Sequence, residues 1–334
     1  MAHSDKPVLV TGASGFVGAA VVRSLLAAGR KVRVLLRPSS DRHNVDGLAV
    51  ELRFGSLTEP RSLAVALEGC GALYHVAADY RLWVRDPESM YAVNVEGTRS
   101  LMEAALAAGV DRVVYTSSVA TLGWRANGDV ADETTPSALA DMVGHYKRSK
   151  FLAEAAVRDL VHTCNLPAVI VNPSTPVGPR DVKPTPTGRV IVEAAAGRMP
   201  AYVDTGLNIV HVDDVARGHL LAEDKGRVGE RYILGGENLS LGEVLRLVAA
   251  VVGRKPPTVQ IPAALVWPVA VVEETLGWLT GREPFATREG LRMARHKMFF
   301  SSAKAERELG YRPRPAREGL ADAVAWFRQA GMCR

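Results

Sequence analysis

The feature that most constrains the fold is a glycine-rich stretch, TGASGFVG, at residues 11–18. Before it stands VLVTG at residues 8–12, a β-branched run that predicts a strand. After it comes GFVGAAVVRSLLAAG at residues 15–29, whose apolar periodicity and terminal glycine predict a helix. Glycine at such a junction permits a tight turn and lets a ligand approach the backbone closely. The pattern therefore predicts a strand–turn–helix unit that is open to a ligand.

Short β-branched runs alternate with helix-period segments through the first half of the chain. The predicted strands are residues 8–12, 31–37, 50–54, 72–78, 112–118 and 168–174. The helices predicted among them include residues 15–29, 60–68 and 88–108. Apolar strands separated by helices are typical of a parallel sheet that is covered on both faces. We therefore predict an α/β fold with a doubly wound parallel sheet (Rossmann fold), which binds ligands at the carboxyl ends of its strands.

After Val177 the pattern loosens into a loop rich in Pro, Gly and Thr, and helices then dominate. The predicted helices there are residues 186–197, 212–223, 240–252, 262–279, 287–297, 302–308 and 316–328. Short strands are predicted near residues 201–203, 207–210, 231–234 and 258–261. We predict that residues 179–206 and 236–334 form a smaller, mostly helical substrate domain. Residues 1–178, joined by 207–235, would form the dinucleotide-binding domain.

Each glycine of the turn has its own expected role. Gly12 would permit the tight turn, and Gly15 would let a pyrophosphate contact backbone N–H groups. Gly18 would let the helix pack closely on the sheet. In the context of strand, turn and helix, these residues predict a dinucleotide cofactor.

The end of the second predicted strand bears on which dinucleotide binds. That strand ends in Arg37, and no carboxylate follows until Asp41. NAD sites usually place an acid there to bind ribose hydroxyls, whereas a guanidinium binds a 2′-phosphate through paired hydrogen bonds. The sequence therefore favours NADP(H) over NAD(H). Two alternatives remain. Arg37 could be a solvated residue at the end of the strand, and Asp41 could provide the acid that an NAD site needs.

Tyr146 and Lys150 are four residues apart at the start of a predicted helix, which places them on one face, one turn apart. A neighbouring ammonium favours the phenolate and would lower the pKa of the tyrosine. Tyr146 could then protonate a carbonyl oxygen or deprotonate an alcohol. Ser118, at the end of a predicted strand, could bind the same oxygen. These three residues are the candidate catalytic group.

Several motifs together resemble the extended short-chain dehydrogenases/reductases, the NAD-dependent epimerase/dehydratase superfamily. They are TGASGFVG, HVAA (75–78), TSS (116–118), YKRSK (146–150), NP (172–173) and HVDDVARGH (211–219). The resemblance implies Ser118, Tyr146 and Lys150 as the catalytic triad. The cofactor-binding residues that it implies are Gly12, Ser14, Gly15, Phe16, Val17, Gly18, Arg37, Ser56, Leu57, Ala77, Ala78, Ser117, Tyr146, Lys150, Pro173 and Ser174. Ser56 is a departure, since the family often has an aspartate there.

Within that superfamily, NPSTPVGPRDVKPTPTGR and SSAKAERELGYRPRP are most similar to hopanoid-associated sugar epimerases and to dihydroflavonol-reductase-like proteins. Three functions stay open: a hopanoid-associated sugar epimerase, an NADPH-dependent aldehyde or ketone reductase, and a non-catalytic NADP sensor. The reductase would act on a lipid-linked or hopanoid side chain. The intact triad counts against the sensor. The family expectation is a homodimer formed through the helices at 88–108 and 145–162.

Two groups of residues are candidates for the substrate side. Asp79, Tyr80 and Trp83 follow the fourth predicted strand and would line the cleft. Arg180, Lys183 and Arg189 could clamp the phosphates of a sugar substrate, or could lie in a solvated loop. A sugar, polyol or lipid-linked carbonyl is the expected substrate, and no His/Cys cluster suggests a metal site.

Composition narrows the partners and the compartment. Lys plus Arg exceed Asp plus Glu by 41 − 36 = 5, and this excess is scattered, which argues against nucleic acid. Three cysteines without a framework suggest a reducing, cytoplasmic compartment, and no signal peptide is expected. The apolar stretch at 261–272 is too short to span a bilayer. It is expected to be a buried helix or, in the alternative, a membrane-facing helix that makes the protein membrane-peripheral.

Overall fold

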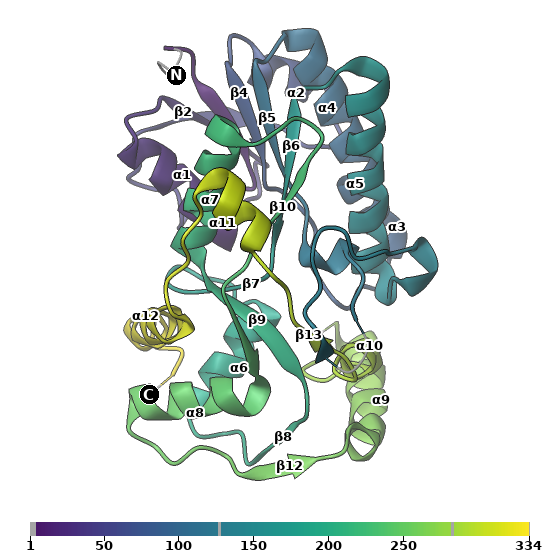
Figure 1. Cartoon of the computed structure of the whole chain (residues 1–334), viewed down its shortest axis with the longest axis vertical. Helices are drawn as coiled ribbons and strands as arrows, with labels where there is room; N and C mark the ends of the chain where they lie inside the picture. The colour runs from purple at the N-terminus through teal and green to yellow at the C-terminus, as the bar shows by residue number, and fades with distance from the viewer. Residues whose placement is uncertain (1–4, 126–127, 282–283, 334) are drawn as a thin grey trace.

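A parallel sheet forms the centre of the upper lobe in Figure 1. The computed structural model describes residues 5–125, 128–281 and 284–333, and within them seven strands form this sheet. In order across the sheet they are β10 (Arg231–Leu234), β6 (Ala168–Pro173), β5 (Arg112–Thr116), β4 (Ala72–His75), β1 (Val8–Thr11), β2 (Val32–Leu36) and β3 (Val50–Phe54). All adjacent strands run parallel, so their carboxyl ends share one edge. This edge faces the lower lobe.

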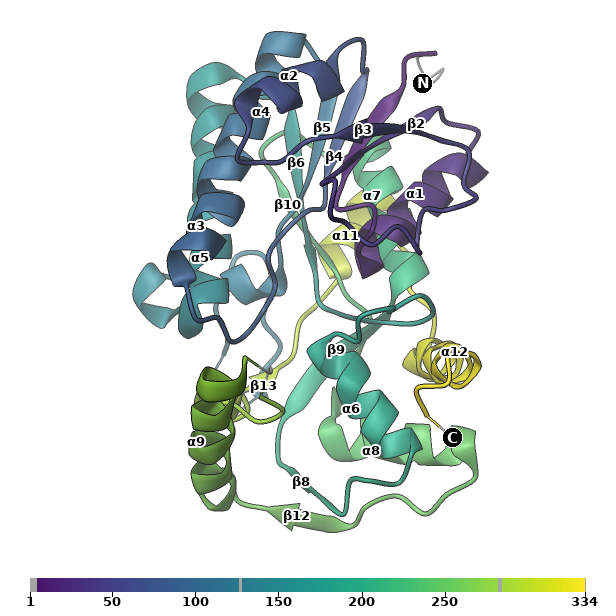
Figure 2. The ribbon, with the colours of Figure 1, turned by 180° about the vertical axis from the view of Figure 1, so that it is seen from behind.

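Helices cover both faces of the sheet, as Figures 1 and 2 show. One face carries α1 (Phe16–Ala27), α7 (Val212–Lys225) and α11 (Ala303–Leu309). The other carries α2 (Pro60–Leu67), α4 (Gly97–Ala108) and α5 (Gly144–Cys164). The prediction of a doubly wound parallel sheet is confirmed.

The segment predicted as one helix at 88–108 is divided into three parts. They are α3 (Pro87–Tyr91), the π-helix η1 (Ala92–Glu96) and α4. Two short 3₁₀ turns, η2 (Val119–Thr121) and η4 (Leu139–Asp141), precede α5. A π-helical turn inserts an extra residue and is often found at functional sites.

The lower lobe contains a small mixed sheet as well as helices. Within the described ranges, β7 (Thr175–Val177), β11 (Glu237–Ser240) and β13 (Lys297–Met298) all pair with β9 (Gly206–His211), and β8 (Ala201–Val203) pairs with β12 (Val259–Ile261). The helices of this lobe are α6 (Pro186–Ala195), α8 (Leu241–Val252), α9 (Ala263–Thr280), α10 (Arg288–Met293) and α12 (Ala316–Gln329). Of the segment 207–235, β10 enters the main sheet, whereas β9 belongs to the small one.

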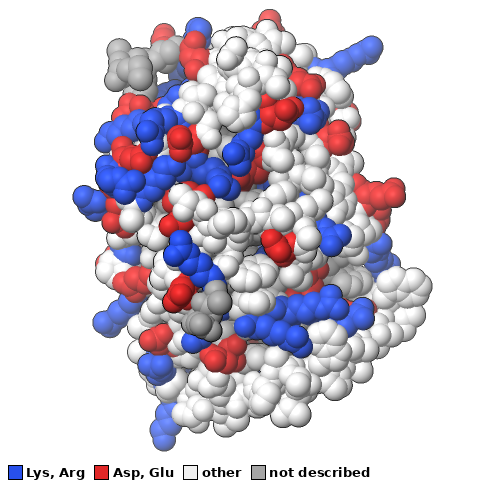
Figure 3. Space-filling view, turned by 45° about the vertical axis from the view of Figure 1, so that its right-hand side comes forward, with Lys and Arg blue, Asp and Glu red and all other residues white. Residues whose placement is uncertain are grey.

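On the face seen in Figure 3, charged side chains are distributed unevenly. Figure 3 shows positive and negative side chains mixed over the upper lobe, while the area over α9 is almost uncharged. Within the ranges that the structure describes, no helix is long and apolar enough to cross a membrane.

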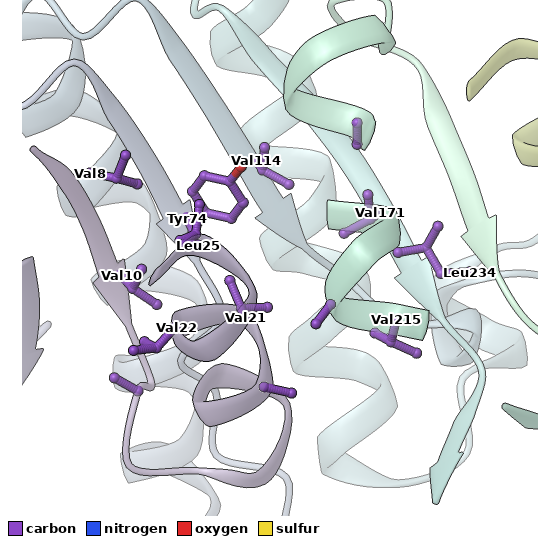
Figure 4. Packing of buried hydrophobic residues seen from close by; sticks show 14 of the residues in the cluster. Val8, Val10, Val21, Val22, Leu25, Tyr74, Val114, Val171, Val215 and Leu234 are labelled. Atoms are coloured by element: carbon purple, nitrogen blue, oxygen red, sulfur yellow. The ribbon is translucent and has the colours of Figure 1, made fainter. Parts of the chain in front are cut away.

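The main core lies between the sheet and its helices. Figure 4 shows Val22 of α1 beside Val10 of β1, and Val215 of α7 beside Val171 of β6. Every residue of β1, β4 and β6 is buried, because helices cover both sides of these strands. This double burial explains why the strands are apolar throughout. It also holds their carboxyl ends in fixed positions at the shared edge.

Candidate active site

The glycine-rich turn joins β1 to α1 at the carboxyl edge of the sheet. Gly12 has a φ of 74°, and a Cβ there would lie 2.6 Å from the backbone nitrogen of Ala77. A Cβ on Gly18 would lie 2.0 Å from the carbonyl oxygen of Gly12. Gly15 is the N-cap residue directly before α1, and its N–H donates to the Gly12 carbonyl at 2.9 Å. The turn is therefore closely packed, and its first helical N–H groups suit a phosphate group.

The other residues predicted around the turn have different surroundings. Asn44 donates to the carbonyl of Ser14 at 3.1 Å and holds the turn from the side of β2. Phe16 and Val17 are partly buried against the main core. Their side chains therefore anchor α1, and the backbone of the turn is left for a ligand.

Arg37 follows β2 and Asp79 follows β4, both at the carboxyl edge of the sheet. Burial tends to raise the pKa of Asp79, but hydrogen bonds and an ion pair with Arg81 and the charge of Arg37 bring the pKa below its ordinary value. Arg37 is exposed at the end of β2, where its backbone N–H donates to Ser40. Its guanidinium is thus close to the predicted cofactor position, where it could meet a phosphate.

The strand ends on both sides of β1 also contain predicted cofactor residues. The N–H of Ala77 donates to the hydroxyl of Thr11 at 3.2 Å, which fixes the backbone after β4. The next residue, Ala78, is half-buried. Ser56 is hydrogen bonded to Thr58 at 2.8 Å, and Leu57 is buried beneath it. The structure therefore brings the ends of β1, β3 and β4 together as predicted for a cofactor groove.

Ser118, Tyr146 and Lys150 converge at the end of β5. The hydroxyl of Tyr146 is hydrogen bonded to Ser118, and this bond lowers the pKa of Tyr146 against a larger increase caused by burial. Lys150 lies one turn along α5 and donates to the carbonyl of Thr116 at 2.8 Å and to the hydroxyl of Tyr115 at 3.2 Å. The three candidate catalytic residues thus share one site.

The expected effect of Lys150 on Tyr146 is not what this geometry gives. Burial raises the pKa of Tyr146 overall and lowers the pKa of Lys150 to about 8, while Glu154 raises the latter. The ammonium is engaged with Tyr115 and the backbone, so its charge is not directed at the phenol. Tyr146 is therefore a proton donor at neutral pH in this arrangement.

Asn94 lies next to the candidate site, and the sequence pattern did not single it out. It lies in the π-helix η1 and is buried. Its side chain accepts from the N–H of Asp79 at 2.7 Å and donates to the carbonyl of Asp79 at 2.8 Å and to the hydroxyl of Ser149 at 2.9 Å. It ties the loop after β4 to the helix of Tyr146 and Lys150. The extra residue of the π turn is visible only in the folded chain.

A buried carboxylate, Glu154, organises the strand ends behind the catalytic group. It accepts from Ser117 at 2.5 Å, from Thr121 at 2.8 Å and from Asn172 at 3.0 Å. Arg231 makes an ion pair with it at 3.4 Å. The hydroxyl of Ser117 is therefore directed into the core, so its predicted cofactor contact would have to involve its backbone.

Pro173 and Ser174 complete the predicted nicotinamide side. Pro173 ends β6, and the next residue is bound through its backbone to Leu234 at 3.2 Å. The hydroxyl of Ser174 is buried and has no hydrogen-bond partner within the described residues. A buried, unpaired hydroxyl is costly unless a ligand satisfies it. Together with the glycine turn, it fits a dinucleotide in this groove.

The first group of candidate substrate residues lies beside the site. Asp79 is ion paired with Arg81 at 2.5 Å, and Tyr80 is exposed. Trp83 lines a pocket of about 250 Å³ together with Arg85 and the end of α9 at Gly281. Of the three residues, only Trp83 lines this pocket, while Asp79 is connected to it through its ion pair with Arg81.

The second group is dispersed. Arg180 is ion paired with Asp213 on α7 at 2.6 Å, Lys183 is exposed, and Arg189 lies on α6. The charge of Arg180 is therefore already balanced. Within the same described residues, no group of three or more His, Cys, Asp or Glu side chains is arranged to hold a metal ion.

The lower lobe contacts the catalytic helix through residues that the sequence did not indicate. The Lys147 ammonium lies 5.1 Å from the ring centre of Trp124, which stacks on His296 at 4.5 Å. Glu289 of α10 packs against Gly144 at the start of α5. Burial raises the pKa of Glu289 to about 7 although Lys147 lowers it. No spacing rule could reveal these contacts, because they join distant segments.

Comparison with known proteins agrees with this geometry. The model of the NAD-dependent epimerase/dehydratase family matches residues 8–235. A Synechocystis protein with the provisional name dihydroflavonol 4-reductase is 43% identical over 326 residues, covering 96% of this chain and 94% of its own. Sterol demethylase protein B of Methylococcus capsulatus is 40% identical, and the match covers 97% of this chain and 99% of that protein. The crystal structure of gox2253 has 57% sequence identity and a TM-score of 0.89, and the match covers 98% of this chain and 100% of that chain. The chain therefore belongs to the NAD-dependent epimerase/dehydratase family of extended short-chain dehydrogenases/reductases.

Proposed function

We propose that this protein is an NADPH-dependent reductase that acts on the carbonyl group of an apolar, lipid-linked substrate. The observation that carries the proposal is the convergence of Ser118 and Tyr146, which are hydrogen bonded, with Lys150 one helical turn away. This group lies at the same sheet edge as the glycine turn. A hydride donor and a proton donor would therefore meet on one carbonyl group.

The chain's own residues account for the proton side of the reaction. A bound nicotinamide supplies the hydride to the carbonyl carbon. Ser118 would hold the carbonyl oxygen, and Tyr146 would donate its proton to that oxygen as the C–O double bond becomes a single bond. Lys150, which donates to the hydroxyl of Tyr115 and the carbonyl of Thr116, would hold the end of β5 and the cofactor in place beside Tyr146. In the reverse direction, Tyr146 would accept the proton of an alcohol.

Arg37 supports NADP(H) as the preferred cofactor. It is exposed at the end of β2 beside the groove, and the residues that follow it directly are Pro38, Ser39 and Ser40. A guanidinium at this position suits a 2′-phosphate, whereas a carboxylate would repel it. The carboxylate of Asp41 accepts the N–H of His43 at 2.9 Å, so this acid is hydrogen bonded within its own loop.

Two further features support an apolar carbonyl substrate. Tyr80 is exposed in the loop after β4, and Trp83 of the same loop lines a pocket; aromatic side chains bind apolar ligands well. The names of the two curated relatives refer to a flavonoid and to a sterol, both polycyclic molecules. The ion pair of Arg180 with Asp213 weakens the case for a phosphate clamp.

A hopanoid-associated sugar epimerase is the second candidate. It is supported by the family description and by Lys183, which is exposed in the loop after β7 and could meet a sugar phosphate. An epimerase returns the hydride to the same substrate, so it would retain its nucleotide. Denaturing the purified protein and identifying the released nucleotide separates the two: bound NAD favours the epimerase, and an empty site that fills with NADPH favours the reductase. For either enzyme we also propose a homodimer through α4 and α5.

The Tyr146→Phe variant tests the catalytic assignment. We expect turnover to fall by roughly a hundredfold or more, because the proton donor is lost, while NADPH affinity is retained. Oxidation of NADPH with dihydroquercetin and with a 3-keto steroid measures turnover, and NADPH fluorescence measures binding. Tyr91→Phe is the matched control, since it removes a hydroxyl whose hydrogen bond within the described residues is to exposed His145 at 3.3 Å. Normal turnover in the Tyr146 variant would remove this residue from the mechanism.

A further inference from the structure

Helix α9 presents apolar side chains to solvent. Ten large apolar side chains are more than half exposed in the described part of the chain, and six of them lie on α9. These six are Leu265, Val269, Val272, Leu276, Trp278 and Leu279. A surface helix normally directs such side chains to the core, so this face requires another partner.

The charged side chains of α9 point the opposite way. Glu273 and Glu274 are the only charged residues of the helix. Glu273 accepts the N–H of Phe285 at 2.7 Å, and Glu274 accepts the N–H and the guanidinium of Arg288, both at 2.6 Å. Both carboxylates are thereby used within the lower lobe. The outer face of α9 is left without charge, and Figure 3 shows this uncharged area with Lys and Arg side chains along its edge.

Guanidinium groups lie beside the apolar face. Arg85 donates to the carbonyl oxygens of Gly277, at 3.3 Å, and Trp278 near the end of α9. Arg292 lies 5.8 Å from the ring centre of Trp267. The apolar side chains of α9 include tryptophan and leucine, and the arginines beside them come from other elements; together they combine the apolar and basic groups that bind the interface of an anionic bilayer.

We propose that the outer face of α9 docks on the surface of an anionic lipid bilayer, with the helix axis along the membrane plane. At 1.5 Å per residue, its 18 residues extend for about 27 Å. Charge complementarity favours lipid over a second copy of the chain. Two copies joined through this face would bring their own arginines together, whereas anionic headgroups would pair with them.

Docking in this orientation would bring the pocket beside the end of α9 close to the lipid. Trp83 and Arg85 line the pocket that ends at Gly281, directly after α9. A carbonyl group on a membrane lipid could then enter from the bilayer surface. This step rests on the proposed reductase function, whereas the docking itself does not.

Vesicle flotation tests the docking. The probes are vesicles of phosphatidylcholine alone and vesicles with about one third phosphatidylglycerol. We expect the wild-type protein to float with the anionic vesicles. The double variant Leu276→Glu, Leu279→Glu should partition at least tenfold less, because carboxylates would then meet the headgroups. Val65→Glu, on α2, is the matched control, since Val65 is also 56% exposed but lies on the other lobe.

Two results would overturn the proposal. One is equal flotation of the wild type and the double variant. The other is no flotation of the wild type together with a dimer, seen by light scattering, that the double variant abolishes, which would assign the face to a second copy. NADPH oxidation with a water-soluble carbonyl should be unchanged in the double variant. Loss of flotation with normal turnover therefore concerns docking alone, whereas the Tyr146→Phe experiment concerns the reaction alone.

Discussion

At the scale of single residues, Arg37 carries the prediction about cofactor choice. In Arg37→Asp, the guanidinium beside the groove is replaced by a carboxylate that repels a 2′-phosphate. We expect the Kd for NADPH to rise at least tenfold and the Kd for NADH to fall. Fluorescence titration of both nucleotides measures this change.

Arg42→Asp is the control for that variant. Arg42 is exposed in the same loop and is ion paired with Asp46 at 3.1 Å, so its loss should leave nucleotide preference unchanged. If the Arg37 variant also kept its preference, the 2′-phosphate would have to be bound by other residues.

Which site residues were predictable depended on whether their chemistry was local. Tyr146 and Lys150 lie one helical turn apart, so their spacing alone places them on one face. Asn94 joins the loop after β4 to α5, and Glu289 reaches α5 from the lower lobe. Such contacts depend on tertiary packing and leave no periodic signal in the sequence. The direction of the Tyr146 pKa shift was also not predictable, because burial raises this pKa by more than the hydrogen bond with Ser118 lowers it.

At the scale of elements, glycines of the β1–α1 turn have two different roles: Gly18 allows close packing, and Gly15 is predicted to leave space for the cofactor phosphates. In Gly18→Ala, the new methyl group would lie 2.0 Å from the Gly12 carbonyl, so the turn must shift and the protein should lose about 1–3 kcal/mol of stability. In Gly15→Ala, the nearest atom is the Gly12 carbonyl oxygen at 3.3 Å, a tight contact that needs only a small shift, so we expect a much smaller decrease in Tm than for Gly18→Ala. NADPH affinity should nevertheless fall at least tenfold, because the methyl group would occupy the predicted place of the pyrophosphate. Thermal unfolding and NADPH titration compare the two. Wild-type affinity in the Gly15 variant would place the phosphates elsewhere.

The strands of the main sheet were predictable because helices bury both of their faces and make them apolar throughout. Strands β7, β11 and β13 are short and partly exposed, and each pairs with β9 rather than with a neighbour in sequence. They therefore lack the apolar run that identifies a buried strand. The π-helix has the same apolar spacing as the α-helices around it, so only the folded backbone reveals it.

At the scale of the whole molecule, two opposing sets of buried groups govern the pH dependence of stability. Burial lowers the pKa of His75 to about 3 and of His219 to about 4, from an ordinary 6.5. Below about pH 6.5 the unfolded chain binds protons that the folded chain does not, so these histidines make stability fall as pH falls. Burial raises the pKa of Asp181 to about 6 and of Glu289 to about 7. There the folded chain binds the extra proton, so these carboxyls make stability rise as pH falls.

Substitution of one group from each set should therefore change the pH profile in opposite directions. At about 1.4 kcal/mol per pH unit for each group, the destabilisation caused by His219→Gln should shrink by about 2 kcal/mol between about pH 7.5 and about pH 5. The destabilisation caused by Asp181→Asn should instead grow by about 1.4 kcal/mol, since its pKa of about 6 lies one unit above the lower pH. Urea unfolding of both variants and the wild type at the two pH values gives these differences. Parallel profiles for the two variants would show that these groups do not titrate differently in the folded and unfolded chains.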